Sequence, residues 1–247
     1  MSAPREPVDV LAFGPHPDDV EICASGLLLR MRDAGRRCAV VDLTRGEKGS
    51  RGDAEIRARE TEAASRLLGL VGRENLGLPD GGLENTLAMV LPVVAAIRRW
   101  RPKVVVGPCP VDLHPDHEIA AAVIRRAYYL ATIGRVDTDG LPPHRPDAIF
   151  HYFGHKEPPP SFVVDVSPVW ERRNEVVRCY ASQLGLDGKD GPTTNIAGKG
   201  FFRRLETRFA YWGERIGAAY GEPYLAERVL AVDDPVEAFR KRDEAVR

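Results

Sequence analysis

Two short segments of this 247-residue chain bring imidazole and carboxylate side chains close together. The first reads G-P-H-P-D-D from Gly14 to Asp19, and the second reads D-L-H-P-D-H from Asp112 to His117. Imidazole nitrogens and carboxylate oxygens can bind a catalytic zinc ion, which takes three protein ligands and leaves a fourth position for water. Together the two segments contain enough such groups for one site of this kind.

Three residues of the two segments can supply the metal ligands, namely His16, Asp19 and His117. Asp18 is then free to accept a proton from water, because two consecutive carboxylates cannot easily both point at one ion. His114 lies three residues before His117, on one side of a first helical turn, and can reach a substrate while His117 binds the metal. Asp116 can hydrogen-bond a histidine and fix its tautomer. Iron(II) is also compatible with this ligand set.

Each segment also has a structural interpretation when it is taken alone. The first could be a turn whose aspartate caps the following helix, and the second could be a helix start with proline in its first turn. We favour the metal site because the two segments follow two strands of one predicted parallel sheet. His151 and His155, in H-Y-F-G-H, could be solvated residues at a strand end or further ligands.

Other polar residues belong to the same edge of the predicted sheet. Four cations could contact an anionic substrate group or lie in solvent: Arg45, Lys48, Arg51 and Arg57. Asp80, in L-P-D-G-G, could accept a hydrogen bond from a substrate hydroxyl or close a turn. The run G-E-K-G-S-R-G lacks the spacing of a P-loop, and no G-x-G-x-x-G follows the first strand. Nucleotide binding is therefore disfavoured.

An alternation of strand and helix patterns positions these segments. Apolar runs typical of buried strands cover 8–13, 38–43, 74–78 and 104–107, and helical patterns cover 22–32, 54–68, 84–100 and 116–132. The alternation predicts a Rossmann-like α/β fold, with a mostly parallel sheet and helices on both faces. Ligands bind beyond the carboxyl ends of such strands, so both histidine segments belong at one edge.

The second half of the chain is less regular. Strand patterns cover 148–153 and 162–166, and helical patterns cover 169–180 and 202–221. Gly185 to Gly200 is a long, polar, glycine-rich stretch that we interpret as a mobile loop. Since no repeat or clear linker is visible, we expect a single domain over 1–247. Its Rossmann-like core would cover 1–135 and a less regular part 136–247.

Composition and charge exclude several classes of function. The chain has 35 Lys and Arg against 36 Asp and Glu, and the formal charge of −1 argues against a polybasic nucleic-acid binder. No apolar run approaches the ~20 residues that span a bilayer. The N-terminus lacks the apolar core of a signal peptide. The four cysteines are scattered without a C-x-x-C, so we expect a cytoplasmic protein with free thiols.

The segments A-F-G-P-H-P-D-D-V-E-I and H-P-D-H resemble those of the LmbE/PIG-L family of zinc-dependent N-acetylglucosaminyl deacetylases. The likeness continues through V-D-L-T-R-G-E-K-G-S-R-G, E-N-L-G-L-P-D-G-G-L, P-S-F-V-V-D-V-S and Y-G-E-P-Y, and covers nearly the whole chain. This fuller set is similar to the subfamily that removes acetate from N-acetylglucosaminyl-malate in bacillithiol biosynthesis.

The resemblance implies zinc on three residues, His16, Asp19 and His117. It also implies that Asp18 is the general base, and that His114 stabilises the charged intermediate or protonates the leaving amine. The expected reaction is metal-assisted hydrolysis of an acetamide, with His114 acting as an imidazolium.

The resemblance further implies positions around the substrate and an assembly. Arg57 would lie near the acid group of the substrate, and Asp80 near sugar hydroxyls. Because such relatives are often hexamers, we expect a homo-oligomer that acts on a small N-acetylglucosaminyl substrate. Relatives often place Arg directly before H-P-D-H, where this chain has Leu113.

Two alternatives stay open. The substrate could be another N-acetylglucosamine conjugate, such as an antibiotic precursor or a chitobiose-like sugar. The chain could also be a non-catalytic sugar-binding protein on the same fold, although the presence of Asp18 and His114 argues against this.

Overall fold

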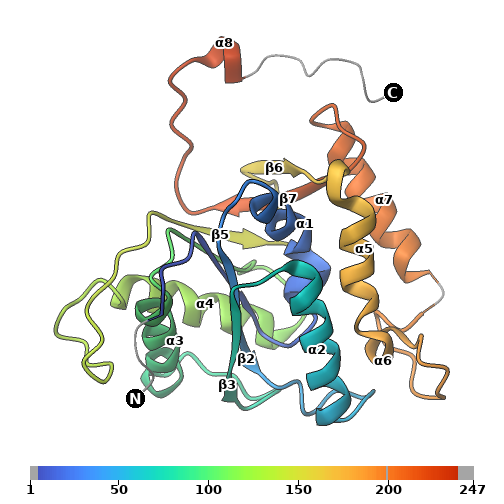
Figure 1. Ribbon diagram of the computed structural model, residues 1–247, viewed down its shortest axis with the longest axis horizontal. Helices are drawn as coiled ribbons and strands as arrows, with labels where there is room; N and C mark the ends of the chain where they lie inside the picture. Colours follow the sequence, from blue (N-terminus) through green and yellow to red (C-terminus); the bar gives the residue numbers. More distant parts are fainter. Residues whose placement is uncertain (1–4, 199, 239–247) are drawn as a thin grey trace.

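Seven strands form one sheet in the computed structural model, which describes residues 5–198 and 200–238 (Figure 1). Their order across the sheet is β3-β2-β1-β4-β5-β7-β6, and all neighbours are parallel except β7, which is antiparallel to β5 and to β6. The strands are β1 Val10–Gly14, β2 Cys38–Thr44, β3 Gly72–Leu78, β4 Val104–Pro108, β5 Ala148–Tyr152, β6 Phe162–Asp165 and β7 Gly221–Ala226.

Helices cover both faces of the sheet (Figure 1). They are α1 Asp19–Asp33, α2 Ala54–Leu68, α3 Leu87–Trp100, α4 Pro115–Leu130, the 3₁₀ turn η1 Ser167–Val169, α5 Trp170–Arg178, α6 Ala181–Leu184, α7 Phe201–Glu214 and α8 Pro235–Ala238. One core joins the sheet to α1, α2, α5 and α7, and a second joins it to α3 and α4. The predicted fold class, one α/β domain with a mostly parallel sheet, is confirmed.

Burial on both faces explains why the central strands are almost wholly apolar, and the exception in β2, Asp42, is paired with Arg73 of β3 at 2.7 Å. Every residue of β1 and of β2 is buried. Within β1, Val10 and Ala12 belong to one core, and Leu11 and Phe13 to the other. A parallel strand covered by helices on both sides has no solvent face for a polar residue. These strands end at the sheet edge where the polar segments begin.

The C-terminal part differs from the sequence-based prediction at one element. The helix predicted over 202–221 ends at Glu214, and Gly221–Ala226 is strand β7. The backbone N–H groups of Ile216 and Ala218 both donate to the carbonyl of Gly213, which closes the helix. The apolar period continues past this turn, and Pro223 inside β7 is unusual for a strand with two neighbours. Both features hide the strand in the sequence.

Helix α1 is joined to β7 through a buried carboxylate. Glu222 accepts hydrogen bonds from the backbone N–H groups of Gly26 and Leu27, at 3.0 and 2.8 Å, in the middle of the helix. Arg173 of α5 donates to the carbonyl of Ile22 one turn earlier. A Cβ at Gly26 would lie 2.5 Å from Cγ1 of Val166, so only glycine fits where helix and strand approach. This contact fixes the position of α1 relative to the sheet.

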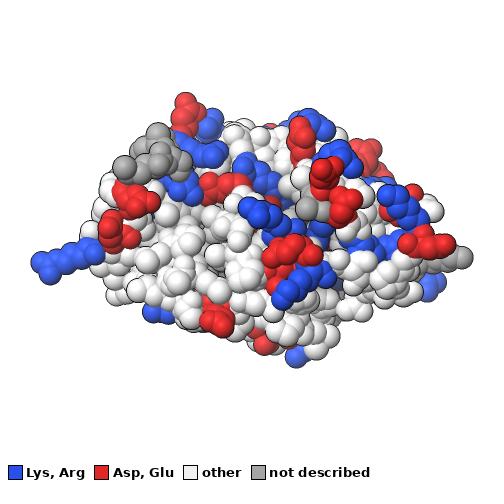
Figure 2. Space-filling model, turned by 90° about the horizontal axis from the view of Figure 1, so that it is seen from below, with Lys and Arg blue, Asp and Glu red and all other residues white. Residues whose placement is uncertain are grey.

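The surface is mixed in charge. Figure 2 shows lysine and arginine side chains interleaved with aspartate and glutamate over one face of the molecule. No helix in the described part of the chain is both long enough and apolar enough to cross a membrane. Beyond β7 the chain forms an extended arm, residues 227–238, that leaves the body of the molecule (Figure 1). Val229 and Val236 of this arm are 97% and 83% exposed.

Candidate metal centre

Two loops at the carboxyl ends of neighbouring strands meet to form the site. The first leads from β1 into α1, and the second from β4 into α4. In the first loop, Asp18 has φ 116°, a region that non-glycine residues adopt only at a cost of about 1–3 kcal/mol. In the second, His114 caps α4 by accepting a hydrogen bond from the backbone N–H of Asp116. Strain of this kind is often stored where a side chain must point at a ligand.

Three side chains, which we call the ligand triad, converge between these loops: His16, Asp19 and His117. The carboxylate of Asp19 lies between the two imidazoles, 3.1 Å from Nδ1 of His16 and 3.3 Å from Nε2 of His117. One donor atom from each residue lies within 4.8 Å of the others. Two imidazole nitrogens and a carboxylate oxygen suit Zn²⁺ or Fe²⁺ and leave room for water.

The charges around the ligand triad favour a cation at its centre. Although burial opposes the charge, hydrogen bonds to Asp116, Asp19 and Asp80 raise the pKa of His16 to about 12. Burial likewise opposes the charge on His117, and the negative charge of Asp19 raises its pKa to about 10. Protons supply this positive charge here, and a divalent ion can take their place when it binds. The residues present therefore fit a metal ion.

Each histidine of the triad has a carboxylate beside its other nitrogen. Nε2 of His16 lies 3.1 Å from Asp80 and 3.3 Å from Asp116. Nδ1 of His117 lies 3.5 Å from Oδ2 of Asp112. Carboxylates in these positions fix the tautomer and ring orientation of a metal-binding histidine, and they raise its basicity.

Asp18 is buried in the same loop as His16 and Asp19. Its carboxylate lies 3.6 Å from the guanidinium of Arg57, which also donates to the carbonyls of Gly46 and Pro17. Burial raises the pKa of Asp18 to about 7, and the positive charge of Arg57 opposes the shift. A carboxylate that titrates near neutrality can both accept and release a proton at working pH.

His114 stacks beside the ligand triad. Its ring centroid is 4.7 Å from that of His117 and 5.0 Å from that of His16. Burial lowers its pKa, and the neighbouring charges of His117 and His16 lower it further. Because Nδ1 accepts the hydrogen bond from Asp116, the proton of the neutral ring is on Nε2. These interactions favour a neutral donor over the imidazolium expected from the sequence.

The structure brings all eight predicted site residues to one edge of the sheet, but two have different surroundings from those expected. Arg57 is 6% exposed, and its guanidinium lies 3.6 Å from the carboxylate of Asp18. Both oxygens of Asp80 have protein partners, since one faces His16 and the other accepts from the backbone N–H of Lys48 at 2.7 Å. Substrate contact by either residue stays a prediction.

Two functional candidates were not assigned from the sequence. Asp112 had no predicted role, although it lies two residues before His114. The sequence does not distinguish a solvated His155 from a ligand. The structure places both against His117. The signal for His155 is the H-Y-F-G-H segment, which begins inside β5 and runs past its carboxyl end at the same edge of the sheet.

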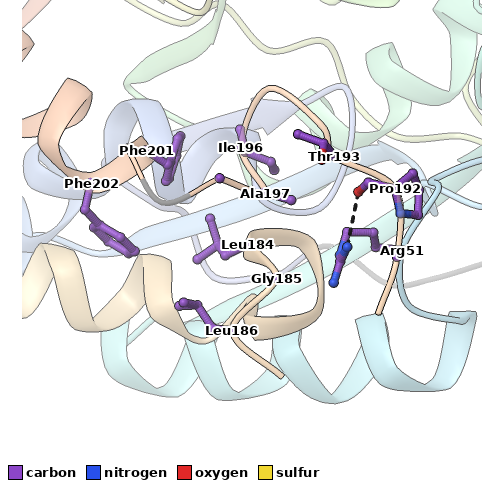
Figure 3. A pocket seen from close by; sticks show the side chains of 12 residues that line it. Arg51, Leu184, Gly185, Leu186, Pro192, Thr193, Ile196, Ala197, Phe201 and Phe202 are labelled. Atoms are coloured by element: carbon purple, nitrogen blue, oxygen red, sulfur yellow. Dashed lines mark hydrogen bonds between the residues drawn. The ribbon is translucent and has the colours of Figure 1, made fainter. Parts of the chain in front are cut away.

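A cavity lies between Arg51, in the loop after β2, and the segment that runs from the end of α6 to the start of α7 (Figure 3). It has a volume of about 460 Å³ and is partly walled by Leu186, Ile196, Phe201 and Phe202. Arg51 secures the glycine-rich stretch here by donating to the carbonyls of Ser182, Lys189 and Pro192. Arg51 therefore contacts protein carbonyls, and the mobility predicted for this stretch stays a prediction.

Several comparisons with known proteins find deacetylases. A family model described as GlcNAc-PI de-N-acetylase matches residues 11–128. The diacetylchitobiose deacetylase of Thermococcus kodakarensis is 31% identical over 193 residues, which cover 72% of this chain and 71% of that protein. Among solved structures, the conserved protein TT1542 from Thermus thermophilus is 36% identical. It has a TM-score of 0.83 over 92% of this chain and 98% of that one.

A second solved structure is an enzyme bound to its inhibitor MPG. This N,N'-diacetylchitobiose deacetylase from Pyrococcus horikoshii is 26% identical to the chain, with a TM-score of 0.76. The match covers 88% of this chain and 83% of that one.

Proposed function

The chain belongs to the PIG-L family, and from this membership we propose that it is a metal-dependent deacetylase of an N-acetylglucosamine conjugate. The observation that carries the proposal is the combination of the ligand triad with Asp18. A binding protein could use the triad alone, but it has no need for a further buried carboxylate, that of Asp18, beside it.

In this proposal the residues divide the work of amide hydrolysis. His16, Asp19 and His117 would bind the ion, which when bound polarises the acetamide carbonyl and lowers the pKa of a water molecule. Asp18 accepts the proton of the attacking water, whose oxygen bonds to the acetamide carbon. Asp18 then delivers the proton to nitrogen as the C–N bond breaks, which gives acetate and a free amine. The raised pKa of Asp18 suits both transfers.

Three further residues, His114, Asp116 and Arg57, support the reaction around the metal ligands and Asp18. Nε2–H of His114 donates to the oxygen on which negative charge develops, as donors in an oxyanion hole do. Asp116 orients His16 through Nε2 and is itself positioned by the backbone N–H of Gly81, at 2.7 Å. The hydrogen bonds that Arg57 donates to Gly46 and Pro17 position its guanidinium beside Asp18.

We also propose N-acetylglucosaminyl-malate as the substrate, on the resemblance of the motifs to the bacillithiol subfamily. Arg57 would then lie near the malate carboxylates, and Asp80 near sugar hydroxyls. A second candidate is an N-acetylated disaccharide. It is favoured by the similarity to two diacetylchitobiose deacetylases and by Leu113, which is 67% exposed beside His114 where an arginine is common in relatives.

The metal, assembly and location are proposed with the same reaction. Zinc is our first choice, and iron(II) suits the same ligands. We expect a cytoplasmic homo-oligomer, as hexamers are common in such relatives. Light scattering of the purified chain measures the assembly.

The first test measures amine release by the metal-loaded protein. The substrates are N-acetylglucosaminyl-malate, diacetylchitobiose and plain N-acetylglucosamine, and the control is Asp18→Ala with its metal content determined. We expect turnover of one conjugate, and a loss of roughly 10²–10⁴-fold in kcat for the variant at unchanged metal content. Loss of metal in Asp18→Ala would show that Asp18 is a ligand instead. Sugar binding without turnover would favour the non-catalytic alternative.

A further inference from the structure

Asp112 is a buried carboxylate beside Nδ1 of His117, and no step of the proposed reaction passes through it. Its side chain is fully enclosed, and both oxygens have partners. Oδ1 accepts hydrogen bonds from the backbone N–H groups of Leu113 and His114, at 2.7 and 2.9 Å. Its Oδ2 accepts a hydrogen bond from the backbone N–H of His155 at 3.0 Å and lies 3.5 Å from Nδ1 of His117. Since backbone N–H groups only donate, the carboxylate is held as an acceptor beside Nδ1 of His117, the nitrogen that faces away from Asp19.

Asp112 also fixes His155 at two points. The backbone N–H of His155 donates to Oδ2 at 3.0 Å, and Nδ1 of its ring lies 2.7 Å from Oδ1. The close approach requires Gly154, since a Cβ there would lie 2.3 Å from Oδ2 of Asp112. A two-point contact of this kind leaves the imidazole little rotational freedom.

The orientation of His155 leaves its other nitrogen available. An ionised carboxylate only accepts hydrogen bonds, so Nδ1 of His155 carries a proton and Nε2 of the neutral ring has a free lone pair. Within residues 5–198 and 200–238, no hydrogen bond reaches Nε2, and the side chain is 29% exposed. The ring centroid is 5.7 Å from that of His117, so His155 lies at the rim of the metal centre.

We propose that His155 binds substrate, with Nε2 accepting a hydrogen bond from a hydroxyl group of the sugar conjugate. We also propose that Asp112 is the positioning residue that aims both His155 and His117. A neutral imidazole that donates to a carboxylate is a good acceptor, because hydrogen bonds in a chain polarise one another. Sugar hydroxyls are matching donors. This inference rests on the proposed deacetylase function and adds a specificity residue to it.

The test of His155 compares His155→Phe with the wild type on the substrate that the metal-loaded enzyme turns over. Phenylalanine keeps a planar ring and removes the acceptor. We expect KM to rise roughly 5- to 15-fold, with kcat and metal affinity within about twofold of the wild type. A conjugate lacking the contacted hydroxyl should bind the wild type as weakly as it binds the variant. His155→Gln, which restores an acceptor oxygen, should recover part of the loss.

Asp112 is tested by a readout other than activity. In Asp112→Asn the metal affinity, measured by chelator competition, should fall about 10- to 100-fold, and KM should rise as in His155→Phe. His155→Phe should leave the metal affinity unchanged, which separates the two roles. An unchanged KM in both His155 variants would overturn the inference, and so would an unchanged metal affinity in Asp112→Asn.

The failure of this inference can be told apart from failure of the proposed function. If the wild type releases no amine from any of the three substrates, the deacetylase proposal fails. In that case the dissociation constants of N-acetylglucosamine and of glucosamine, measured by calorimetry on the metal-loaded proteins, replace KM as the readout. Weaker sugar binding by His155→Phe than by the wild type would still support the hydrogen bond between His155 and a sugar hydroxyl. Active wild type with unchanged kinetics in both His155 variants would overturn the contact alone. Circular dichroism confirms that each variant is folded.

Discussion

His16 is surrounded by three carboxylates, more than are needed to accept the single N–H of a neutral imidazole. Asp19 lies at one nitrogen, and Asp80 and Asp116 lie at the other. The ligand triad could be predicted from the sequence because its members lie in two segments at the ends of strands. The partnership of Asp80 with His16 could not, because Asp80 belongs to a separate turn after β3. Only the packing of that turn against the β1–α1 loop brings them together.

Removing the charge of Asp80 should weaken metal binding without changing the ligands. In Asp80→Asn, we expect about 10- to 100-fold lower metal affinity, because His16 loses a carboxylate that orients it and raises its basicity. Chelator competition measures this directly. Glu62→Gln, which removes a charge from an exposed ion pair with Arg66, is the matched control and should retain wild-type affinity. Equal metal affinity in both variants would show that Asp116 alone is enough to orient His16 for metal binding.

At the level of secondary structure, α1 depends on a residue far along the chain. Glu222 is separated by 196 residues from Gly26, whose backbone N–H donates to its carboxylate. The helical pattern of α1 is visible in the sequence, but a local pattern contains no information about a contact at this separation. The same limit explains β7, which is defined by its pairing with β5 and β6 and has a proline at its centre. The strands β1 and β2 are visible in the sequence, because burial on both faces makes almost all of their residues apolar.

Glu222 makes the stability of the fold depend on pH. Burial raises its pKa above the ordinary value of 4.5, and the hydrogen bond from Tyr224 opposes the shift. A group with a raised pKa in the folded state stabilises the fold below its unfolded pKa, and this contribution is lost as pH rises through the folded value. Glutamine does not titrate. The free energy of unfolding of Glu222→Gln, relative to wild type, should therefore increase between pH ~4 and ~7, by an amount on the order of 1 kcal/mol.

Urea unfolding of both proteins across this pH range measures the difference. The slope with pH is the informative quantity, because the amide also changes the hydrogen bonds to Gly26 and Leu27 at every pH. Parallel curves for the two proteins would show that Glu222 has the same pKa in the folded and unfolded states.

In the whole molecule, the metal centre joins the two helical layers. Asp19 begins α1, which packs in one core, and His117 lies on α4, which packs in the other. A metal ion bound by both residues would therefore connect the layers across the edge of the sheet. The sequence predicted this layered arrangement from the alternation of strands and helices. It did not predict that β7 and β6 extend the sheet with antiparallel pairing.

Metal removal should lower the thermal stability of the whole domain. A ligand present at about 100 times its Kd stabilises the folded state by about 2.7 kcal/mol. For a chain of this size, we expect chelation to lower Tm by roughly 5–10 °C. Differential scanning calorimetry with and without chelator measures the shift, and restored zinc should reverse it. Asp19→Ala, which lacks a ligand from α1, should show little response to either treatment. An equal shift in that variant would place the stabilising metal elsewhere.

The contact between Glu222 and α1 also has a consequence for biosynthesis. His16 and Asp19 leave the ribosomal exit tunnel long before Glu222 does. Until it does, the backbone N–H groups of Gly26 and Leu27 lack their carboxylate partner, and α1 has no fixed position over the sheet. The nascent chain therefore exposes its metal-binding side chains until Glu222 has emerged, and the finished centre forms only after that.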